Sequence, residues 1–257
     1  MKAMWSGSIE FGLVNIPVKL YSATAESDIS LHMLDKKDHS NIRYKRINEN
    51  TGKEVDWKNI VRAYKYDDKY IVLENEDFET ASAKKSQVIE IYSFVMENEI
   101  DTIYYETPYY LEPAESGIHA YGLLREALKE SKKVGIANFV LHKKEHLAIL
   151  KIRDNVLVLN KIRFEQEIKN PSELNIPEKS NIKSKELEMA LLLIDQLTTK
   201  FDIKKYKDTY ASQLMKIIKA KAKGTKITPF KMKIVPTTGE NLTKQLEKSL
   251  TSKKKAA

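Results

Sequence analysis

The opening of the chain alternates between apolar and polar residues, and this pattern constrains the fold more than any other feature of the sequence. In WSGSIEFGLVNIPVKLYSAT, residues 5–24, Trp5, Ile9 and Phe11 share one phase, whereas the apolar residues after Gly12 follow the opposite phase. A period of two residues predicts half-buried strands. The change of phase beside Gly12 predicts a bulge or tight turn, because glycine tolerates the backbone angles that such a turn needs.

Similar short segments continue to about residue 165. Strands are predicted at residues 69–74, 88–95, 102–113, 134–142, 146–153 and 155–164, a hairpin turn with strand-like arms at 49–52, and helices at 75–85 and 118–131. Many short strands with tight turns are typical of sandwiches and barrels. The predicted class is mainly β, of the α+β type, with an antiparallel β-barrel core.

Beyond Pro171 and Pro177 the pattern becomes helical, with helices predicted at residues 184–199 and about 203–222. Met189–Ile194 is apolar on all sides, so it requires burial on more than one side. Packing within the monomer and packing on a second subunit both satisfy this requirement. After a linker at 225–238, the leucines of GENLTKQLEKSL form a stripe that predicts either a short helix docking in a partner's groove or a disordered tail. These leucines are Leu242, Leu246 and Leu250.

Charge is concentrated near the carboxyl end. Residues 223–257 hold nine lysines and two glutamates, a net +7 of the +8 of the whole chain. A basic tail on a nearly neutral body is a stronger indication of an acidic partner than the total charge of the chain. The chain contains no cysteine, which excludes disulfides and thiolate chemistry and is compatible with a reducing cytoplasm. Its longest apolar run, Met189–Ile194, is far too short to cross a membrane.

One short motif has a catalytic counterpart. HKKEH, His142–His146, fits the H-x-x-E-H pattern of zinc peptidases, in which both histidines must lie on one helical face. The flanking FVL and LAIL segments predict two strands joined by a tight turn, so an exposed hairpin tip is the competing interpretation. The sequence holds no P-loop, G-x-G-x-x-G or G-x-S-x-G motif. We therefore expect no enzyme activity, no metal and no cofactor.

Basic residues gather in several places along the body of the chain. Spread-out positive charges suit phosphate contacts that need no base recognition, although a lysine on a strand or loop is commonly just solvated. Interleaved tyrosines at 44, 64, 66 and 70 suit either base stacking or strand packing. These basic residues include Arg43, Lys45 and Arg46 on one strand-like arm, then Lys58, Arg62 and Lys65, and Lys143 and Lys144 at the hairpin tip.

Several long motifs, in one order along the chain, carry a family resemblance. MWSGSIEFGLVNIPVKLYSAT closely resembles the amino-terminal signature of bacterial Ku proteins, the DNA end-binding factors of non-homologous end joining. The resemblance continues to about residue 222 through IRYKRINENTGKEV, PYYLEP, YGLLREAL, VGIANFVLHKKEHLAIL and ELEMALLLIDQL.

This resemblance implies a non-catalytic homodimer of the cytoplasm, associated with the nucleoid. Residues 1–180 would form the barrel with an inserted bridge at about 40–90, and two bridges would close a ring around duplex DNA. Residues 181–222 would form a helical arm that embraces the partner barrel. Residues 223–257 would form a tail whose leucine helix recruits an ATP-dependent, multifunctional DNA ligase of the ligase D type. Candidate dimer contacts are Leu187, Leu191, Ile194 and Leu197. Within this frame the candidate DNA contacts are the bridge cations Arg43, Lys45, Arg46, Lys58, Arg62 and Lys65, with Lys143 and Lys144 of the barrel.

Two other classes remain open. One is a general nucleic-acid binding protein with no preference for ends. The other is a metallohydrolase that uses His142, Glu145 and His146.

Overall fold

The structure is a computed structural model that describes residues 1–25, 29–81, 87–177, 182–225 and 242–253. The chain forms two compact units. The first comprises Met1–Glu26 and His32–Asn170, and the second comprises Ser27–Leu31 and Pro171–Ala257. Each unit is described by itself below.

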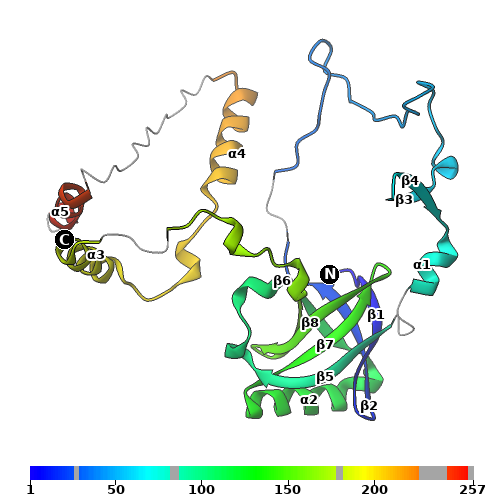
Figure 1. Ribbon diagram of the computed structural model, residues 1–257, viewed down its shortest axis with the longest axis horizontal. Helices are drawn as coiled ribbons and strands as arrows, with labels where there is room; N and C mark the ends of the chain where they lie inside the picture. The colour runs from blue at the N-terminus through cyan, green and yellow to red at the C-terminus, as the bar shows by residue number, and fades with distance from the viewer. Residues whose placement is uncertain (26–28, 82–86, 178–181, 226–241, 254–257) are drawn as a thin grey trace. The chain divides into compact units, whose positions relative to one another are not determined.

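A closed seven-stranded barrel forms the centre of the first unit (Figure 1). Around the barrel the strands follow the order β1, β2, β6, β9, β8, β7, β5. This confirms the predicted barrel. The strands are β1 (Trp5–Phe11), β2 (Val14–Ser22), β5 (Val88–Met96), β6 (Tyr105–Pro113), β7 (Lys133–Leu141), β8 (Lys144–Arg153) and β9 (Val156–Ile162).

The barrel closes through a parallel pair, which differs from the antiparallel barrel expected from the sequence. Ser8–Glu10 of β1 runs parallel to Val88–Glu90 of β5, whereas the other neighbouring strands of the barrel pair antiparallel. Immediately before this pair, the Ser8 N–H donates to the Gln87 carbonyl at 3.0 Å. The backbones approach so closely here that a Cβ atom on Gly7 would lie closer than 3.0 Å to the Gln87 carbonyl oxygen and to the Trp5 ring.

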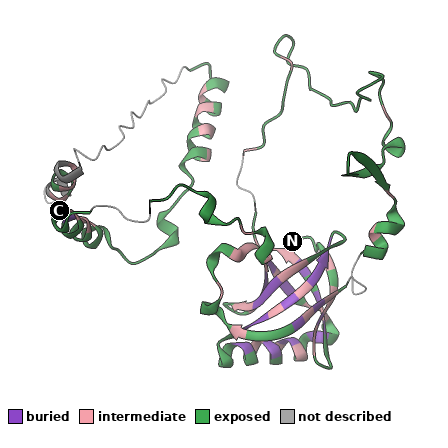
Figure 2. Ribbon diagram, in the orientation of Figure 1, coloured by how far each residue is buried: buried purple, intermediate pink, exposed green. Residues whose placement is uncertain are grey.

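Inward-facing residues of these strands make up the core (Figure 2). The alternation predicted from the sequence supplies them, because every second side chain along a strand points to the same face. The opening hairpin shows this directly: Ile9, Ile16, Val18 and Leu20 are fully or almost fully buried. The phase changes at a tight turn at Gly12, whose φ of 59° is positive.

Helix α2 (Ile118–Ser131) packs on the barrel with Tyr121, Leu124 and Leu128 buried. The Tyr121 hydroxyl donates to the Leu111 carbonyl and accepts from the Leu157 N–H, both at 2.8 Å. It thus joins α2 to β6 and β9, and satisfies polar groups that would otherwise be costly to bury.

The chain leaves the barrel after β2 and returns at β5, and we call the connecting residues 23–87 the excursion. It contains the short strands β3 (Arg62–Tyr66) and β4 (Lys69–Leu73), which pair with each other, the single turn η1 (Trp57–Asn59) and helix α1 (Asn75–Ala81). No described residue of the excursion is buried (Figure 2). The predicted strand at 69–74 and the start of the predicted helix at Asn75 are confirmed, while β3 was not predicted.

The turn predicted at residues 49–52 forms, but its strand-like arms do not. Ile47 and Glu54 make an isolated bridge, and the Asn48 carbonyl accepts from the Gly52 N–H at 2.8 Å. Residues 42–46 are irregular and exposed. The Ile42 N–H donates to the Met33 carbonyl and the Arg46 carbonyl accepts from the Val55 N–H, but these bonds do not extend into a regular ladder. Because none of these side chains is buried, they gain little from regular pairing.

The second unit contains helices α3 (Ser184–Leu197), α4 (Thr209–Ala222) and α5 (Leu242–Lys253). Helix α4 starts later than the predicted residue 203, because the Asp208 carboxylate accepts from the Ala211 N–H at 3.2 Å and caps the helix there. The linker predicted at 225–238 lies almost wholly outside the described residues. Among the described helices, none is both long and apolar enough to span a membrane.

Substitution of Gly7 tests the closure of the barrel. We expect Gly7→Ala to lower the free energy of unfolding by about 1–3 kcal/mol, because the added methyl group overlaps the Gln87 backbone carbonyl as well as the Trp5 ring. Gly122→Ala in α2 is the matched control, since a Cβ atom there meets no atom within 4 Å. Urea unfolding of both variants measures the difference, with Gly122→Ala expected to gain about 0.5–1 kcal/mol from helix propensity. Equal stability of the two variants would contradict the tight closure.

Candidate nucleic-acid interface

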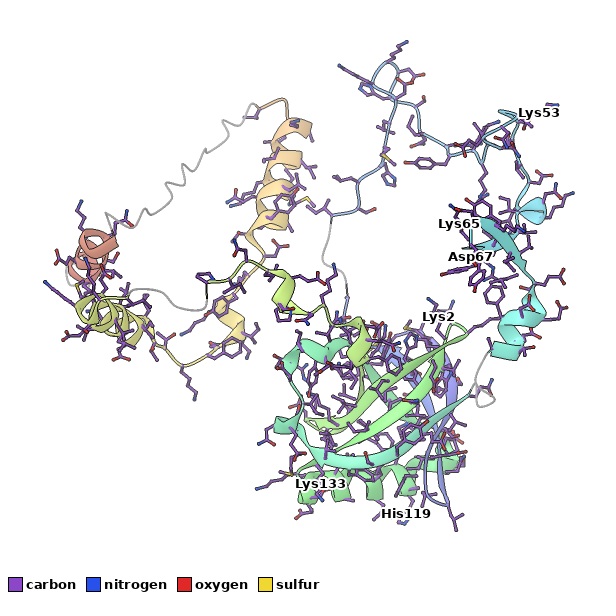
Figure 3. All side chains as sticks on the ribbon, in the orientation of Figure 1. Lys2, Lys53, Lys65, Asp67, His119 and Lys133 are labelled. Atoms are coloured by element: carbon purple, nitrogen blue, oxygen red, sulfur yellow. The ribbon has the colours of Figure 1, made fainter. Side chains whose placement is uncertain are left out.

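Charge is segregated along the excursion. Residues 36–66, which we call the basic section, hold nine lysines and arginines against four acids, a net +5. Residues 67–81, the acidic section, hold one lysine and six acids, a net −5. Figure 3 labels Lys53 and Lys65 in the first of these sections and Asp67 in the second. An anionic polymer would therefore be attracted to the basic section and repelled beyond it.

Two arginines of the basic section lie over aromatic rings. The Arg46 guanidinium carbon is 4.5 Å from the centre of the Trp57 ring, and that of Arg62 is 3.9 Å from the centre of the Phe78 ring. Arg62 also donates to Asn75 Oδ1 at 3.3 Å. Stacking of this kind orients a guanidinium without neutralising its charge. Both arginines can thus present positive charge in a fixed direction.

Three lysines of the basic section form exposed ion pairs. Lys45 contacts Glu54 at 2.6 Å and Lys65 contacts Asp68 at 2.8 Å, while Lys58 and Asp56 are 3.9 Å apart. The hydrogen bond that Lys45 donates to the Glu54 carboxylate raises the pKa of Lys45. Exposed pairs of this type contribute little to stability and are screened by salt. A phosphate group can therefore replace the carboxylate at low cost.

The remaining candidates are Arg43 and the barrel hairpin tip. Within the part of the chain that the structure describes, Arg43 forms no ion pair and is exposed. Lys143 lies 4.0 Å from Glu79 of α1, at the limit of an ion pair, and Lys144 is exposed on β8. The eight predicted cations are thus all exposed.

The tyrosines of the β3–β4 hairpin are not used for packing. Tyr64, Tyr66 and Tyr70 are all well exposed, although strand packing was one of the two interpretations of this pattern. A two-stranded hairpin is at best marginally stable alone in water. Its exposed aromatic rings are thus available to stack on bases or on another surface.

The HKKEH motif forms the tip of the β7–β8 hairpin, as the flanking strands predicted. His142 and Lys143 occupy the turn with positive φ angles of 53° and 66°, which fits a type I′ turn. Further along, Glu145 and His146 point to opposite faces of β8: Glu145 accepts from Asn138 Nδ2 at 2.6 Å, and His146 packs on the Phe139 ring. Across the described residues, no three His, Asp or Glu side chains lie close enough to hold a metal ion.

His146 lies at the end of the barrel among charged groups. Burial lowers its pKa, and the ammonium group of Lys161 lowers that pKa further. Lys161 in turn pairs with Glu106 at 2.7 Å, and this hydrogen bond lowers the pKa of the Glu106 carboxyl. His146 is thus neutral near pH 7 and adds no positive charge to the hairpin tip.

A surface pocket of about 670 Å³ lies between α2, β2 and β6. Its hydroxyl groups already serve structural bonds: Tyr21 donates to Glu112 at 2.5 Å, and Tyr121 joins α2 to two strands. The hydrogen bond to Glu112 raises the pKa of Tyr21, and burial raises that of Tyr121. In this pocket the hydroxyls of Tyr21 and Tyr121 are thus engaged in contacts that hold the strands and α2 together.

In the second unit, the predicted dimer contacts are all exposed. Between 51% and 58% of each of the four side chains is accessible in the single chain. Soluble monomers rarely expose contiguous apolar surface of this kind. The four residues are Leu187, Leu191, Ile194 and Leu197.

The fold and the charge distribution define a β-barrel protein with a long insertion that is basic over residues 36–66, and with an exposed apolar arm. A family model of the Ku70/Ku80 beta-barrel domain matches residues 10–189, and the chain belongs to the Ku family. It is 42% identical to a protein of Bacillus subtilis (strain 168), over 90% of this chain and 76% of the relative. It is 38% identical to one of Coxiella burnetii, over 99% and 96%, and 36% identical to one of Mycobacterium tuberculosis, over 87% and 84%. Each relative is named non-homologous end joining protein Ku.

Sequence reasoning missed the groups that position these cations. The counter-charges at Glu54 and Asp68 and the rings of Trp57 and Phe78 were visible as residues, but their pairing spans up to 16 positions and follows no periodic pattern. The segregation of charge between the two sections was detectable, because it needs only a count of charges along the excursion.

Proposed function

We propose that this chain forms a homodimeric ring that binds the ends of double-stranded DNA without sequence specificity. The observation that carries the proposal is an excursion with no described buried residue, fixed at both ends to a rigid barrel and basic over residues 36–66. The names of the relatives support a role in non-homologous end joining. The excursion serves as the bridge, and two bridges from two copies enclose the duplex.

Within this proposal the cations of the basic section contact phosphates. Such contacts position a protein on a duplex but do not identify its sequence. The stacked arginines Arg46 and Arg62 hold fixed directions, whereas the paired lysines exchange a carboxylate for a phosphate. Lys143 and Lys144 extend the contact to the barrel.

The arm supplies the dimer contact in this proposal. Burying a leucine or isoleucine side chain fully stabilises an assembly by about 1.5–3 kcal/mol, so a stripe of half-exposed residues favours association. Leu187, Leu191 and Ile194 recur at intervals of four and three residues, and so lie on one face of α3. This face packs on the second copy.

The leucines of α5 recruit an ATP-dependent DNA ligase of the ligase D type in this proposal, and the protein itself holds the break without catalysing its repair. An amphipathic helix that lays one apolar face into a groove is a common mode of peptide recognition. Leu246 and Leu250 lie four residues apart and thus share a face of α5. No cofactor is needed for any of these steps.

A comparison of linear and circular DNA tests the ring. We expect the protein to bind a linear duplex and to bind the same sequence poorly as a covalently closed circle, because a closed ring loads only from an end. Ligation of the linear complex should trap the protein on the resulting circle. Gel-shift assays with both forms measure this. Equal binding to both forms would favour the general nucleic-acid binding protein instead.

Arg43 tests the assignment of the basic section. We expect Arg43→Ala to weaken binding about equally for unrelated duplex sequences and to reduce the log–log salt slope by about 1, since one phosphate contact is lost. Lys129→Ala removes the same charge from α2 and is the control, because Lys129 is exposed and paired with Glu126. Fluorescence anisotropy over a salt series measures both. Identical slopes for the two variants would remove Arg43 from the interface.

Leu191 tests the dimer face. We expect Leu191→Ser to shift the protein from dimer to monomer, measured by light scattering after size-exclusion chromatography. Its neighbour Leu192 is the matched control, since the two side chains are 53% and 50% exposed but face different directions on α3. A dimer that tolerates Leu191→Ser as well as Leu192→Ser would contradict the proposed interface.

A further inference from the structure

Helix α3 has two apolar stripes that differ in exposure. Met189 is buried, with 8% of its surface accessible, and Ala190 and Leu193 are half-buried on the same side of the helix. Leu187, Leu191 and Ile194 form the exposed stripe described above. The two stripes lie roughly 115° apart around the axis, at 100° per residue. Something therefore already covers the first stripe and leaves the second accessible.

Helix α5 covers the first stripe. The main contact of α3 within the described chain is with α5 (Figure 1). On α5, Gln245, Leu246 and Leu250 are half-buried, whereas the side chains of residues 247–249 between them are exposed. The leucine stripe of α5 thus faces α3, and its polar side faces solvent.

The composition of the two helices explains why they pair. An isolated helix of twelve residues is marginal in water, so α5 gains stability by placing its leucines on a second apolar surface. Helix α3 is apolar all round at Met189–Ile194 and so needs cover on more than one side. Because both helices belong to one chain, their pairing is intramolecular and needs little affinity.

We propose that the Met189–Leu193 face of α3 is a docking surface for the leucine stripe of α5. Docking on α3 keeps the leucines of α5 covered until a partner displaces α5. The proposal rests on the proposed function insofar as the partner is the ligase. Leu246 and Leu250 cannot contact α3 and a groove on another protein at once. Recruitment therefore requires release of α5, and the apparent affinity for the ligase falls with the fraction of chains in which α5 is released.

The same geometry separates the release of α5 from the formation of the dimer. The exposed stripe of Leu187, Leu191 and Ile194 lies on a different side of α3 from α5, so a second copy can pack there while α5 stays docked. We call the contact between α3 and α5 the clasp. The clasp thus controls binding of the ligase and leaves dimer formation unaffected.

A cross-link between introduced cysteines tests the clasp. Because the chain contains no native cysteine, only the introduced thiols can be cross-linked. The full chain carrying Ala190→Cys and Gln245→Cys is treated with a short, reducible bismaleimide. We expect an intrachain cross-link, seen at monomer mass on a denaturing gel. The control pair, Glu188→Cys with Gln245→Cys, places the first thiol on the opposite, exposed side of α3 and should react far less. Equal reaction of the two pairs, or cross-linking at dimer mass, would overturn the intrachain clasp.

The cross-linked protein then tests what the clasp controls, with a purified ATP-dependent ligase of the same organism as the probe. We expect the cross-link to abolish stimulation of end joining, and reduction of the linker to restore it, while DNA binding and dimer mass stay unchanged. Full stimulation in the cross-linked state would show that the covered stripe does not control recruitment. Deletion of residues 239–257 is the separate arm: stimulation that survives this deletion refutes the proposed ligase contact and leaves the cross-linking result standing.

Discussion

The parallel pairing of β1 with β5 is the contact on which the rest of the structure depends. It joins Ser8–Glu10 to Val88–Glu90, closes the barrel, and fixes the point to which the excursion must return. Closing a loop of this length costs entropy that grows only slowly with the number of residues. The buried strands on either side of the pair offset that cost. A segment with no described buried residue can therefore be held at both ends while all its side chains stay accessible.

The electrostatic design of the excursion follows from that accessibility. In the absence of a core, its charged groups are organised by contacts with one another: Lys45 and Lys65 by carboxylates, Arg46 and Arg62 by aromatic rings. Such contacts are individually weak in water. These contacts fix the direction of each cationic side chain without removing its charge. An incoming polyanion would therefore meet positioned cations and would displace few strong bonds. The acidic section beyond residue 66 limits how far along the excursion a polyanion would extend.

The parts of this fold that could be predicted from sequence are those with a period. Alternation identified the β1–β2 and β7–β8 hairpins, because in both the inward face is continuously apolar. Alternation failed for residues 42–46, where β-favouring residues have no neighbouring strand, and for β3, whose side chains have no buried face. It could not reveal the parallel closure either, since pairing across some eighty residues leaves no local trace. Of the candidate site, residue types and the charge of each section were predictable, whereas the partner of each cation was not.

The exposed apolar surface of helix α3 indicates contacts that its composition alone does not specify. From the sequence, Met189–Ile194 required cover on several sides, and a single chain supplies it on one side through α5. The side left exposed carries Leu187, Leu191 and Ile194 at intervals of four and three residues, so one helix has one covered and one uncovered apolar face. Because α5 contributes its leucines to this cover, Leu246 and Leu250 are half-buried in the single chain. A short helix that is apolar all round can thus have one face covered within its own chain and still present a second apolar face to its surroundings.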